Sequence, residues 1–468
     1  MTYPQPTTVD ADVHTHSIAH IKQPTNMGSE HQPLRHSGIY RNLPTFDKSL
    51  HGLSALVVGA TGISGFNTIR SLLDTPERWS TIYAVSRSPL TDEMLSLLSP
   101  KQKCRIRHVS VDLTGSVIDI ASSLQEGGVH ADYVFFYGYI SPKGVSAMDP
   151  RAEEQMVETN VPLFRNFLDA LPVANITPKR ILLQTGGKNY GGQIGRARTP
   201  YVESDPQPRH LSKNFYYPQE DLLRDYCNRH PECGWNVIRP FGVVGAVPNA
   251  AMTTFLPFAI LATVSAKKGE PVFFGGDIEE WQYECLHSSA RLTGFLSEWA
   301  VLEDKCKDQA FNAHDGSPLS WDRFFEELVR WYGVERGIEG PEMDDDKFQV
   351  TQLKGGEGSP MGYGPPTAIK LSRTLAEWSK EPGNEEAWKK MMDESNGQLK
   401  INVFQSGADV FMGDFAFYKI GQASSAKLRR FGFCGFVDAM ESVFEMYEDM
   451  AKMGVLPYPK VEAARPMI

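Results

Sequence analysis

The sequence lacks the patterns that mark structural metal clusters and disulfide frameworks. Its six cysteines are scattered over 468 residues, and no two of them form a C-x-x-C pair. Cysteines without such spacing favour reduced thiols, which are typical of a cytoplasmic protein. Three histidines near the N-terminus, His14, His16 and His20, have no acidic or cysteine partner at a fixed spacing. We therefore expect a solvated tail there and no metal site.

Excess positive charge and long apolar runs are missing as well. The formal net charge of −10 argues against nucleic acid or an anionic lipid surface as a partner. The longest apolar tract, AAMTTFLPFAILATVSA, is interrupted by threonines and Pro257, and it is shorter than the ~20 residues of a membrane span. We expect a buried helix there and no membrane span. The N-terminus shows no basic region followed by an apolar run, so no secretory signal is recognisable.

What the sequence does contain is an ordinary globular composition, with 41% hydrophobic and 22% charged residues. From Ser54 onwards, short apolar runs alternate with amphipathic segments, a pattern typical of a doubly wound parallel Rossmann sheet. The predicted strands are residues 55–59, 82–86, 106–111, 133–138, 180–185 and 236–240. The predicted helices lie near residues 63–74, 91–98, 117–125, 150–171 and 217–230.

Three regions follow from this pattern. Residues 1–50 are rich in His, Pro, Thr and Ser and are predicted to be a flexible arm, and residues 51–248 form the Rossmann domain. Residues 249–468 are predicted to be a mostly helical lobe that shapes a substrate pocket, with a strand and helices returning to the core near 286–333. The glycine-rich and acidic stretch 337–363 is predicted to be a long surface loop.

A glycine-rich turn follows the first predicted strand, in VVGATGISGFNTIRSLL. Glycines between a strand and a helix allow a tight turn and a close approach of a pyrophosphate to the backbone. The predicted dinucleotide-binding turn comprises Gly59, Thr61, Gly62, Ile63 and Gly65. A turn that serves only packing is the alternative.

The second predicted strand ends in Ser86 and Arg87, where an NAD-binding chain carries an acidic residue for the ribose hydroxyl. A guanidinium beside a hydroxyl suits a 2′-phosphate, so NADP(H) is the predicted cofactor. The alternative is that Arg87 is a surface residue and cofactor selectivity is mixed. Asp112 and Leu113 follow the third strand, where such folds contact the adenine.

Several ordered motifs together resemble a known family. GATGISG, LQTGGKNYGG, NFYYPQED, RPFGVVG and FNAHDGSPLSWDRFFEEL are similar to the progesterone 5β-reductase and iridoid synthase group of atypical extended short-chain dehydrogenases/reductases. The similarity runs from about Gly52 to the C-terminus, and GIYRNLPTF looks like the fungal branch. The resemblance implies that Tyr216 is the catalytic tyrosine. It also implies that Lys188, from TGGKNY, is the partner cation that a YxxxK pair supplies elsewhere, and that the loop containing Val243 covers the nicotinamide.

The chemistry of these two residues can be argued without the family. Hydride addition to an enone pushes negative charge onto the carbonyl oxygen, which a hydrogen-bond donor such as Tyr216 stabilises. An ammonium such as that of Lys188 is expected to lower the pKa of the phenol and to bind the nicotinamide ribose. The alternatives are that Tyr217 is the donor, that both tyrosines are packing residues, or that Lys188 is simply solvated.

Other residues have two interpretations each. Tyr137 and Tyr139 lie either beside the hydride path or in the core, and Asn160 either orients the site through water or is an ordinary polar residue of a helix. Three late phenylalanines line either an apolar pocket or the core: Phe411, Phe415 and Phe417.

The function predicted from these features is an NADPH-dependent reductase of an α,β-unsaturated carbonyl, acting by 1,4-addition on a small apolar compound such as a secondary metabolite. The same residues suit 1,2-reduction of a ketone or aldehyde, and a non-catalytic NADP(H)-sensing regulator is the alternative from another class. Relatives often carry arginine and histidine where this chain has Gly187 and Asn189, which leaves the substrate open. The assembly is left open between a monomer and a homodimer.

Overall fold

A parallel sheet of seven strands lies at the centre of the protein, whose computed structural model describes residues 33–141, 150–248, 253–419 and 421–467. The strand order, β12-β8-β7-β6-β3-β4-β5, reverses direction between β3 and β6, as in doubly wound Rossmann folds. The predicted fold class is therefore confirmed. The strands are β3 (Leu53–Val58), β4 (Trp79–Ser86), β5 (Ile106–Ser110), β6 (Tyr133–Phe136), β7 (Arg180–Gln184), β8 (Gly234–Pro240) and β12 (Gln309–Ala313).

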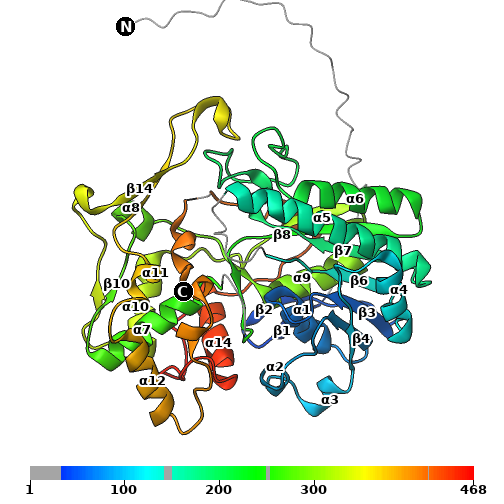
Figure 1. Ribbon diagram of the computed structural model, residues 1–468. Helices are drawn as coiled ribbons and strands as arrows, with labels where there is room; N and C mark the ends of the chain where they lie inside the picture. Colours follow the sequence, from blue (N-terminus) through cyan, green and yellow to red (C-terminus); the bar gives the residue numbers. More distant parts are fainter. Residues whose placement is uncertain (1–32, 142–149, 249–252, 420, 468) are drawn as a thin grey trace, which may run out of the picture.

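Both faces of this sheet are covered by helices. In β3, Ala55 and Val57 belong to one apolar core, whereas Leu56 and Val58 belong to another. Because successive side chains of a strand point to opposite faces, a continuous apolar run requires cover on both sides. In Figure 1, α1 and α9 lie side by side on one face, and α5 and α6 lie side by side on the other. These flanking helices are α1 (Ile63–Leu73), α4 (Val117–Glu126), α5 (Pro150–Val173), α6 (Tyr216–Arg229) and α9 (Ala290–Leu302).

The link between β4 and β5 contains two short helices, α2 (Asp92–Ser96) and α3 (Pro100–Lys103), where the sequence predicts one. Ser99 caps α3 through the backbone N–H of Gln102, and Pro100 takes the first helical position. Proline fits there because that position has no helical hydrogen bond to lose, whereas it cannot continue a preceding helix.

Most of the chain after β8 forms a helical lobe, which lies on the left of Figure 1. Its helices are α7 (Leu256–Lys268), α8 (Ile278–Trp281), α10 (Trp321–Tyr332), α11 (Leu375–Trp378), α12 (Asn384–Glu394), α13 (Ala426–Phe431) and α14 (Ala439–Lys452). In α7 every residue from Leu256 to Ser265 is buried, as the apolar tract predicts. Among the described residues, no helix combines the length and apolar character needed to cross a bilayer.

Short strands complete the lobe and correct one prediction. β9 (Val243–Val244) pairs with β11 (Ser288–Ser289), β10 (Val272–Phe273) with β13 (Ile338–Glu339), and β14 (Gln349–Gln352) with β15 (Ala368–Leu371). The stretch 337–363 is therefore not one continuous loop, because β13 and β14 lie within it. All four residues of β14 are exposed. The sequence therefore shows no alternation of apolar and polar residues there, and the strand could not be predicted from such a pattern.

The predicted flexible arm is wrong for its last third. Residues 34–44 form a hairpin of β1 (Leu34–Ser37) and β2 (Tyr40–Pro44), in which Tyr40 and Leu43 are fully buried. Two inward-pointing side chains in so short a segment give no periodic signal, which explains the error. Residues 1–32, including His14, His16 and His20, lie outside the described residues.

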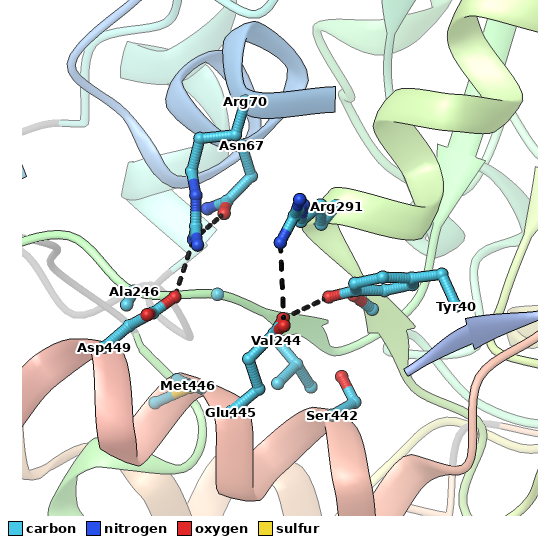
Figure 2. Close-up of a pocket in the computed structure, with 12 residues that line it drawn as sticks. Tyr40, Asn67, Arg70, Val244, Ala246, Arg291, Ser442, Glu445, Met446 and Asp449 are labelled. Carbon is cyan, nitrogen blue, oxygen red and sulfur yellow. Dashed lines mark hydrogen bonds and ion pairs between the residues drawn. The ribbon is translucent and has the colours of Figure 1, made fainter. Parts of the chain in front are cut away.

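A cluster of buried and half-buried charged side chains connects α14 to the Rossmann part (Figure 2). Arg70 of α1 pairs with Asp449 of α14, with 2.7 Å between Nη1 and Oδ2. Arg291 of α9 lies 3.6 Å from Oε1 of Glu445. The other carboxylate oxygen of Glu445, Oε2, accepts a hydrogen bond of 2.5 Å from the Tyr40 hydroxyl. We term these five residues the α14 ion cluster. It joins the lobe to the helix that follows the glycine-rich turn.

Candidate functional site

The turn after β3 has the shape that the glycine motif predicts. Gly59 has a φ of +82°, and a methyl group added there would lie 2.9 Å from the backbone nitrogen of Gly138. At Gly65 an added methyl group would lie 2.2 Å from the Gly59 carbonyl oxygen. The backbone is therefore folded so closely that only glycine fits at both positions. This closeness is what a pyrophosphate-binding turn requires.

The N-terminus of α1 opens directly from this turn. Its N-cap, Gly62, has no side chain to cap the helix, and the first turn carries no acidic residue. The backbone N–H groups of the first turn and the positive end of the helix dipole therefore face outward beside exposed Gly62. Thr61 and Ile63 flank this N-cap as predicted, and both are half-buried. These features fit an anionic phosphate group.

The end of β4 carries the residues predicted to select the cofactor. Ser86 donates a hydrogen bond of 2.7 Å to the carbonyl oxygen of Ser88, which shapes the turn. Arg87 is exposed, and its guanidinium makes no hydrogen bond or ion pair with any residue that the structure describes. A guanidinium beside the carboxyl end of β4 is well suited to a phosphate on the adenosine ribose.

Asp112 and Leu113 occupy the turn after β5. The Asp112 carboxylate accepts hydrogen bonds of 3.0 and 2.8 Å from the backbone and hydroxyl of Thr114, and these bonds hold its pKa below the ordinary value. Leu113 Cδ1 lies 3.0 Å from where a methyl group on Gly138 would be. Since Gly138 also abuts Gly59, Leu113 borders the glycine turn.

The loop after β8 lies against the helical lobe. The backbone N–H of Phe241 donates a 2.7 Å hydrogen bond to Ser288 Oγ, and Gly242 has a φ of +47°. Val243 is half-buried and pairs with Ser288 across the two-residue β9–β11 ladder. These contacts fix the loop. Because all seven strands are parallel, the loop lies at the same edge of the sheet as the other predicted cofactor residues.

Lys188 follows the end of β7 and Tyr216 begins the next helix, so both lie at the same edge of the sheet. Lys188 lies in a 3₁₀ turn, Gly187–Tyr190, after β7, and Tyr216 is the first residue of α6. A methyl group added at Gly186 would lie 3.1 Å from Tyr216 Oη, so the phenol covers the residue just before the lysine turn. Asn214 Nδ2 donates a 3.0 Å hydrogen bond to the Lys188 carbonyl oxygen, which ties the start of α6 to that turn.

Burial governs the proton affinity of both side chains. It raises the pKa of the Tyr216 phenol well above its ordinary value, and the neighbouring Tyr139 raises it further. Lys188 is not among the groups that act on this phenol in the described residues, so the expected lowering of the phenol pKa by the ammonium is not found. Burial lowers the pKa of Lys188, while Glu153 opposes that effect. Tyr216 is accordingly protonated at neutral pH and available as a hydrogen-bond donor.

The neighbouring tyrosines and Asn160 have structural partners. Tyr217 donates to the Asn189 carbonyl oxygen at 3.2 Å, and Tyr137 receives a 2.8 Å hydrogen bond from Thr68. The buried Asn160 forms hydrogen bonds with both the backbone N–H and the carbonyl oxygen of Ile140. Tyr139 differs from these residues because its side chain is 54% exposed beside Tyr216.

The late phenylalanines pack mainly in the lobe. Phe417 contacts Trp321 with 4.9 Å between ring centroids, and Phe411 contacts Phe404 at 5.1 Å. Both are buried, whereas Phe415 is half-buried. No group of three potential metal-binding side chains occurs in the described ranges.

Sequence reasoning missed the polar residues that surround the two predicted catalytic groups. Glu220 and Arg239 form a buried ion pair beside the lysine turn, and Gln207 links Glu220 to Asn189. In the sequence, these two residues are visible only as the first acid of NFYYPQED and the arginine of RPFGVVG. Both motifs were used for the resemblance to a family, and nothing in them indicates an ion pair.

Known proteins resemble this chain over most of its length. The family model of the PRISE-like Rossmann-fold domain matches residues 55–352. A short chain dehydrogenase of Penicillium aethiopicum is 26% identical, over 86% of this chain and 99% of that protein. The 3-oxo-Delta(4,5)-steroid 5-beta-reductase of Arabidopsis thaliana is 25% identical, over 86% and 93% of the two chains. An (S)-8-oxocitronellyl enol synthase of Nepeta racemosa is 29% identical, over 60% and 70%.

Among solved structures, a UDP-glucose-4-epimerase from Stenotrophomonas maltophila with bound NAD is 15% identical. It aligns over 62% of this chain and 87% of that chain with a TM-score of 0.48. A UDP-Glc/GlcNAc 4-epimerase from Campylobacter jejuni aligns with the same TM-score and 17% identity, over 63% of this chain and 88% of that chain.

Proposed function

Because the chain belongs to the PRISE-like Rossmann-fold family, a group of short-chain dehydrogenase/reductase-type oxidoreductases, we propose that it is an NADPH-dependent reductase of α,β-unsaturated carbonyl compounds. The observation that carries this proposal is the position of the Tyr216 phenol. It stands over Gly186, two residues before Lys188, at the sheet edge where the glycine turn opens. A protonated donor at that point can meet a carbonyl oxygen beside the cofactor.

The roles of the two residues follow from their surroundings. The nicotinamide, when bound, supplies a hydride to the β-carbon of the substrate. Tyr216 donates a hydrogen bond, and then its proton, to the carbonyl oxygen on which negative charge develops, and the resulting enol tautomerises to the saturated carbonyl compound. Lys188, from the turn after β7, would hold the nicotinamide ribose.

NADPH as the cofactor is supported by the end of β4. The Arg87 guanidinium makes no hydrogen bond or ion pair with a described residue, and Ser86 places a hydroxyl next to it. A phosphate on the adenosine ribose takes hydrogen bonds from a guanidinium in a planar, two-pronged geometry. We infer that Arg87 binds this phosphate.

The substrate class in this proposal is a small apolar compound with an enone or enal group, as found in secondary metabolism. Support comes from two relatives whose names denote a reductase of a 3-oxo-Delta(4,5)-steroid and a synthase of an 8-oxocitronellyl enol. We propose a cytoplasmic location, because all six cysteines are free thiols.

The test is to follow NADPH oxidation with a panel of enones, enals and ketones, and to identify the products, for the wild type and for Tyr216→Phe. We expect saturated carbonyl products from the wild type and a fall in kcat of about 100-fold in the variant. Tyr458→Phe is the matched control, because this tyrosine is 51% exposed near the C-terminus. The control should keep the wild-type rate.

Three results would contradict parts of the proposal. Alcohol products formed only from ketones and aldehydes would replace 1,4-addition by 1,2-reduction, which uses the same phenol. Unchanged turnover in Tyr216→Phe would exclude the tyrosine as the donor. Cofactor binding without turnover of any carbonyl would identify a binding protein instead.

A further inference from the structure

Glu220 stands four residues after Tyr216, on the same face of α6, at the position where a YxxxK pair has its lysine. Its side chain is fully buried, with an exposed fraction of 0%. Both of its oxygens accept hydrogen bonds of 3.0 Å from Arg239 Nη2, and Arg239 Nε lies 3.3 Å from Oε1. A buried carboxylate is costly unless it is paired in this way.

The Glu220 carboxylate also joins three segments around the active-site edge. Arg224 donates to Oε2 at 2.7 Å from within α6, and Gln207 donates at 3.2 Å from the loop before α6. Thr185, directly after β7, lies within 3.5 Å of Oε1. The start of α6 is thereby held against the ends of β7 and β8.

The same network reaches the turn that carries Lys188. Gln207 donates a second hydrogen bond, of 2.8 Å, to Asn189 Oδ1. Arg239 Nη1 donates to Tyr190 Oη at 3.2 Å, and Tyr190 Oη donates in turn to Asn312. The two residues after Lys188 are therefore fixed by the partners of Glu220.

Arg239 lies one residue before the end of β8, and the loop over the proposed nicotinamide site follows that strand. Two residues later, Phe241 stacks on Tyr190 with 6.3 Å between centroids and 7° between ring planes. The Arg239 guanidinium thus contacts the helix of Tyr216 and the lysine turn, and Tyr190 of that turn stacks on the loop after β8.

We infer that the Glu220–Arg239 ion pair is a positioning unit that sets the phenol of Tyr216 and the ammonium of Lys188 in register over the nicotinamide. This inference rests on the proposed function. Neither residue touches the phenol or the ammonium, so the pair acts through the backbone of α6 and of the lysine turn. A buried ion pair imposes geometry without adding much stability over apolar replacements of similar shape.

The test compares the wild type with Glu220→Gln and with the double variant Glu220→Gln/Arg239→Met, which removes both charges of the pair and leaves Arg224 with Asp221 at 3.4 Å. We expect the double variant to keep the wild-type Tm within a few degrees and its affinity for NADPH. Its kcat should fall about 100-fold at unchanged KM, as for a misplacement of about 1 Å. Asp225→Asn, on the exposed side of the same helix, is the control that keeps the wild-type kcat.

A second measurement does not depend on turnover. Amide hydrogen exchange in residues 186–192 should become at least ~10-fold faster in the double variant, while exchange in β3 stays unchanged. If the wild type reduces no carbonyl compound, the proposed function fails, and this exchange difference alone decides whether the pair orders the lysine turn. Unchanged exchange in residues 186–192 of the double variant would overturn the inference. So would a double variant in which both kcat and Tm return to the wild-type values.

Discussion

At Gly65, a single added methyl group would lie 2.2 Å from the Gly59 carbonyl oxygen, so the turn must open to accommodate alanine. Gly65→Ala is therefore expected to cost about 1–3 kcal/mol in the free energy of unfolding. Because the displaced backbone is also the proposed pyrophosphate site, the Kd for NADPH should rise at least ~10-fold. Denaturant titration and fluorescence titration with NADPH measure the two effects.

Gly340→Ala is the matched control for this substitution, since its added methyl group meets no atom within 4 Å and its φ is not positive. It should change neither quantity. A Gly65→Ala variant with wild-type affinity for NADPH would contradict the assignment of the turn.

Arg87 provides a residue-scale test of cofactor choice. Arg87→Ala removes charge-assisted hydrogen bonds to the 2′-phosphate, worth about 1.5–3 kcal/mol, and should raise the Kd for NADPH about 10- to 100-fold. The Kd for NADH should not change, because NADH lacks that phosphate. Binding titrations with both cofactors measure the difference, with the exposed Arg336→Ala as control. An equal change for both cofactors would show that Arg87 does not select between them.

At the scale of elements, most strands of the central sheet were predictable because they are apolar runs, although the edge strand β5 has only one buried residue. All four residues of β6 are buried, for example, and such a run has few alternatives. β2 and β14 were not predictable in this way. In β2 only part of the strand is buried, and in β14 no residue is buried, so backbone pairing alone defines them.

The site was predictable to a similar, uneven degree. The glycine turn follows from local spacing, since Gly59 and Gly65 meet within one turn. The pairing of Tyr216 with Lys188 required the resemblance to a family, because nothing local in the sequence connects the turn after β7 to the start of α6. The Glu220–Arg239 pair was missed because its members lie 19 residues apart, without any periodic pattern.

The contact between the segment Gly413–Phe417 and α11 predicts a pH dependence of stability. Asp414 accepts a 2.8 Å hydrogen bond from the backbone N–H of Leu375, while its Oδ1 is buried without a partner in the described structure. Burial raises the pKa of this carboxyl from 3.8 to about 7. The folded state thus binds the proton more tightly than the unfolded state, so this contribution to stability is lost as the pH rises from about 4 to about 7.

Asp414→Asn removes this titration and should stabilise the protein relative to the wild type more at pH 8 than at pH 4. The difference between the two pH values is expected to be up to about 4 kcal/mol, at about 1.36 kcal/mol per pKa unit. Free energies of unfolding from urea titrations at both pH values measure it, with the exposed Asp225→Asn as control. The same change in stability at both pH values would contradict a raised pKa for Asp414.

For the whole molecule, the α14 ion cluster is a charged contact between the Rossmann part and the helical lobe. Arg70 and Asp449 are 10% and 5% exposed in their side chains, so their ion pair is largely shielded from solvent. The pair joins the helix of the glycine turn to the last long helix of the chain (Figure 2). Substitutions in this cluster therefore test whether the two parts unfold together.

Arg70→Met leaves the Asp449 carboxylate with Lys452, at 3.6 Å, as its remaining ion pair in the described residues. The free energy of unfolding should fall by about 3–5 kcal/mol, because a buried charge then lacks its main partner. Arg70→Met/Asp449→Leu removes both charges and should recover most of that loss, since buried ion pairs can be replaced by apolar residues at little cost. Urea titrations of the wild type, both single variants and the double variant complete a double-mutant cycle. Additive losses in the double variant would contradict a direct ion pair, and a second unfolding transition in Arg70→Met would show that the cluster is what makes the two parts unfold as one.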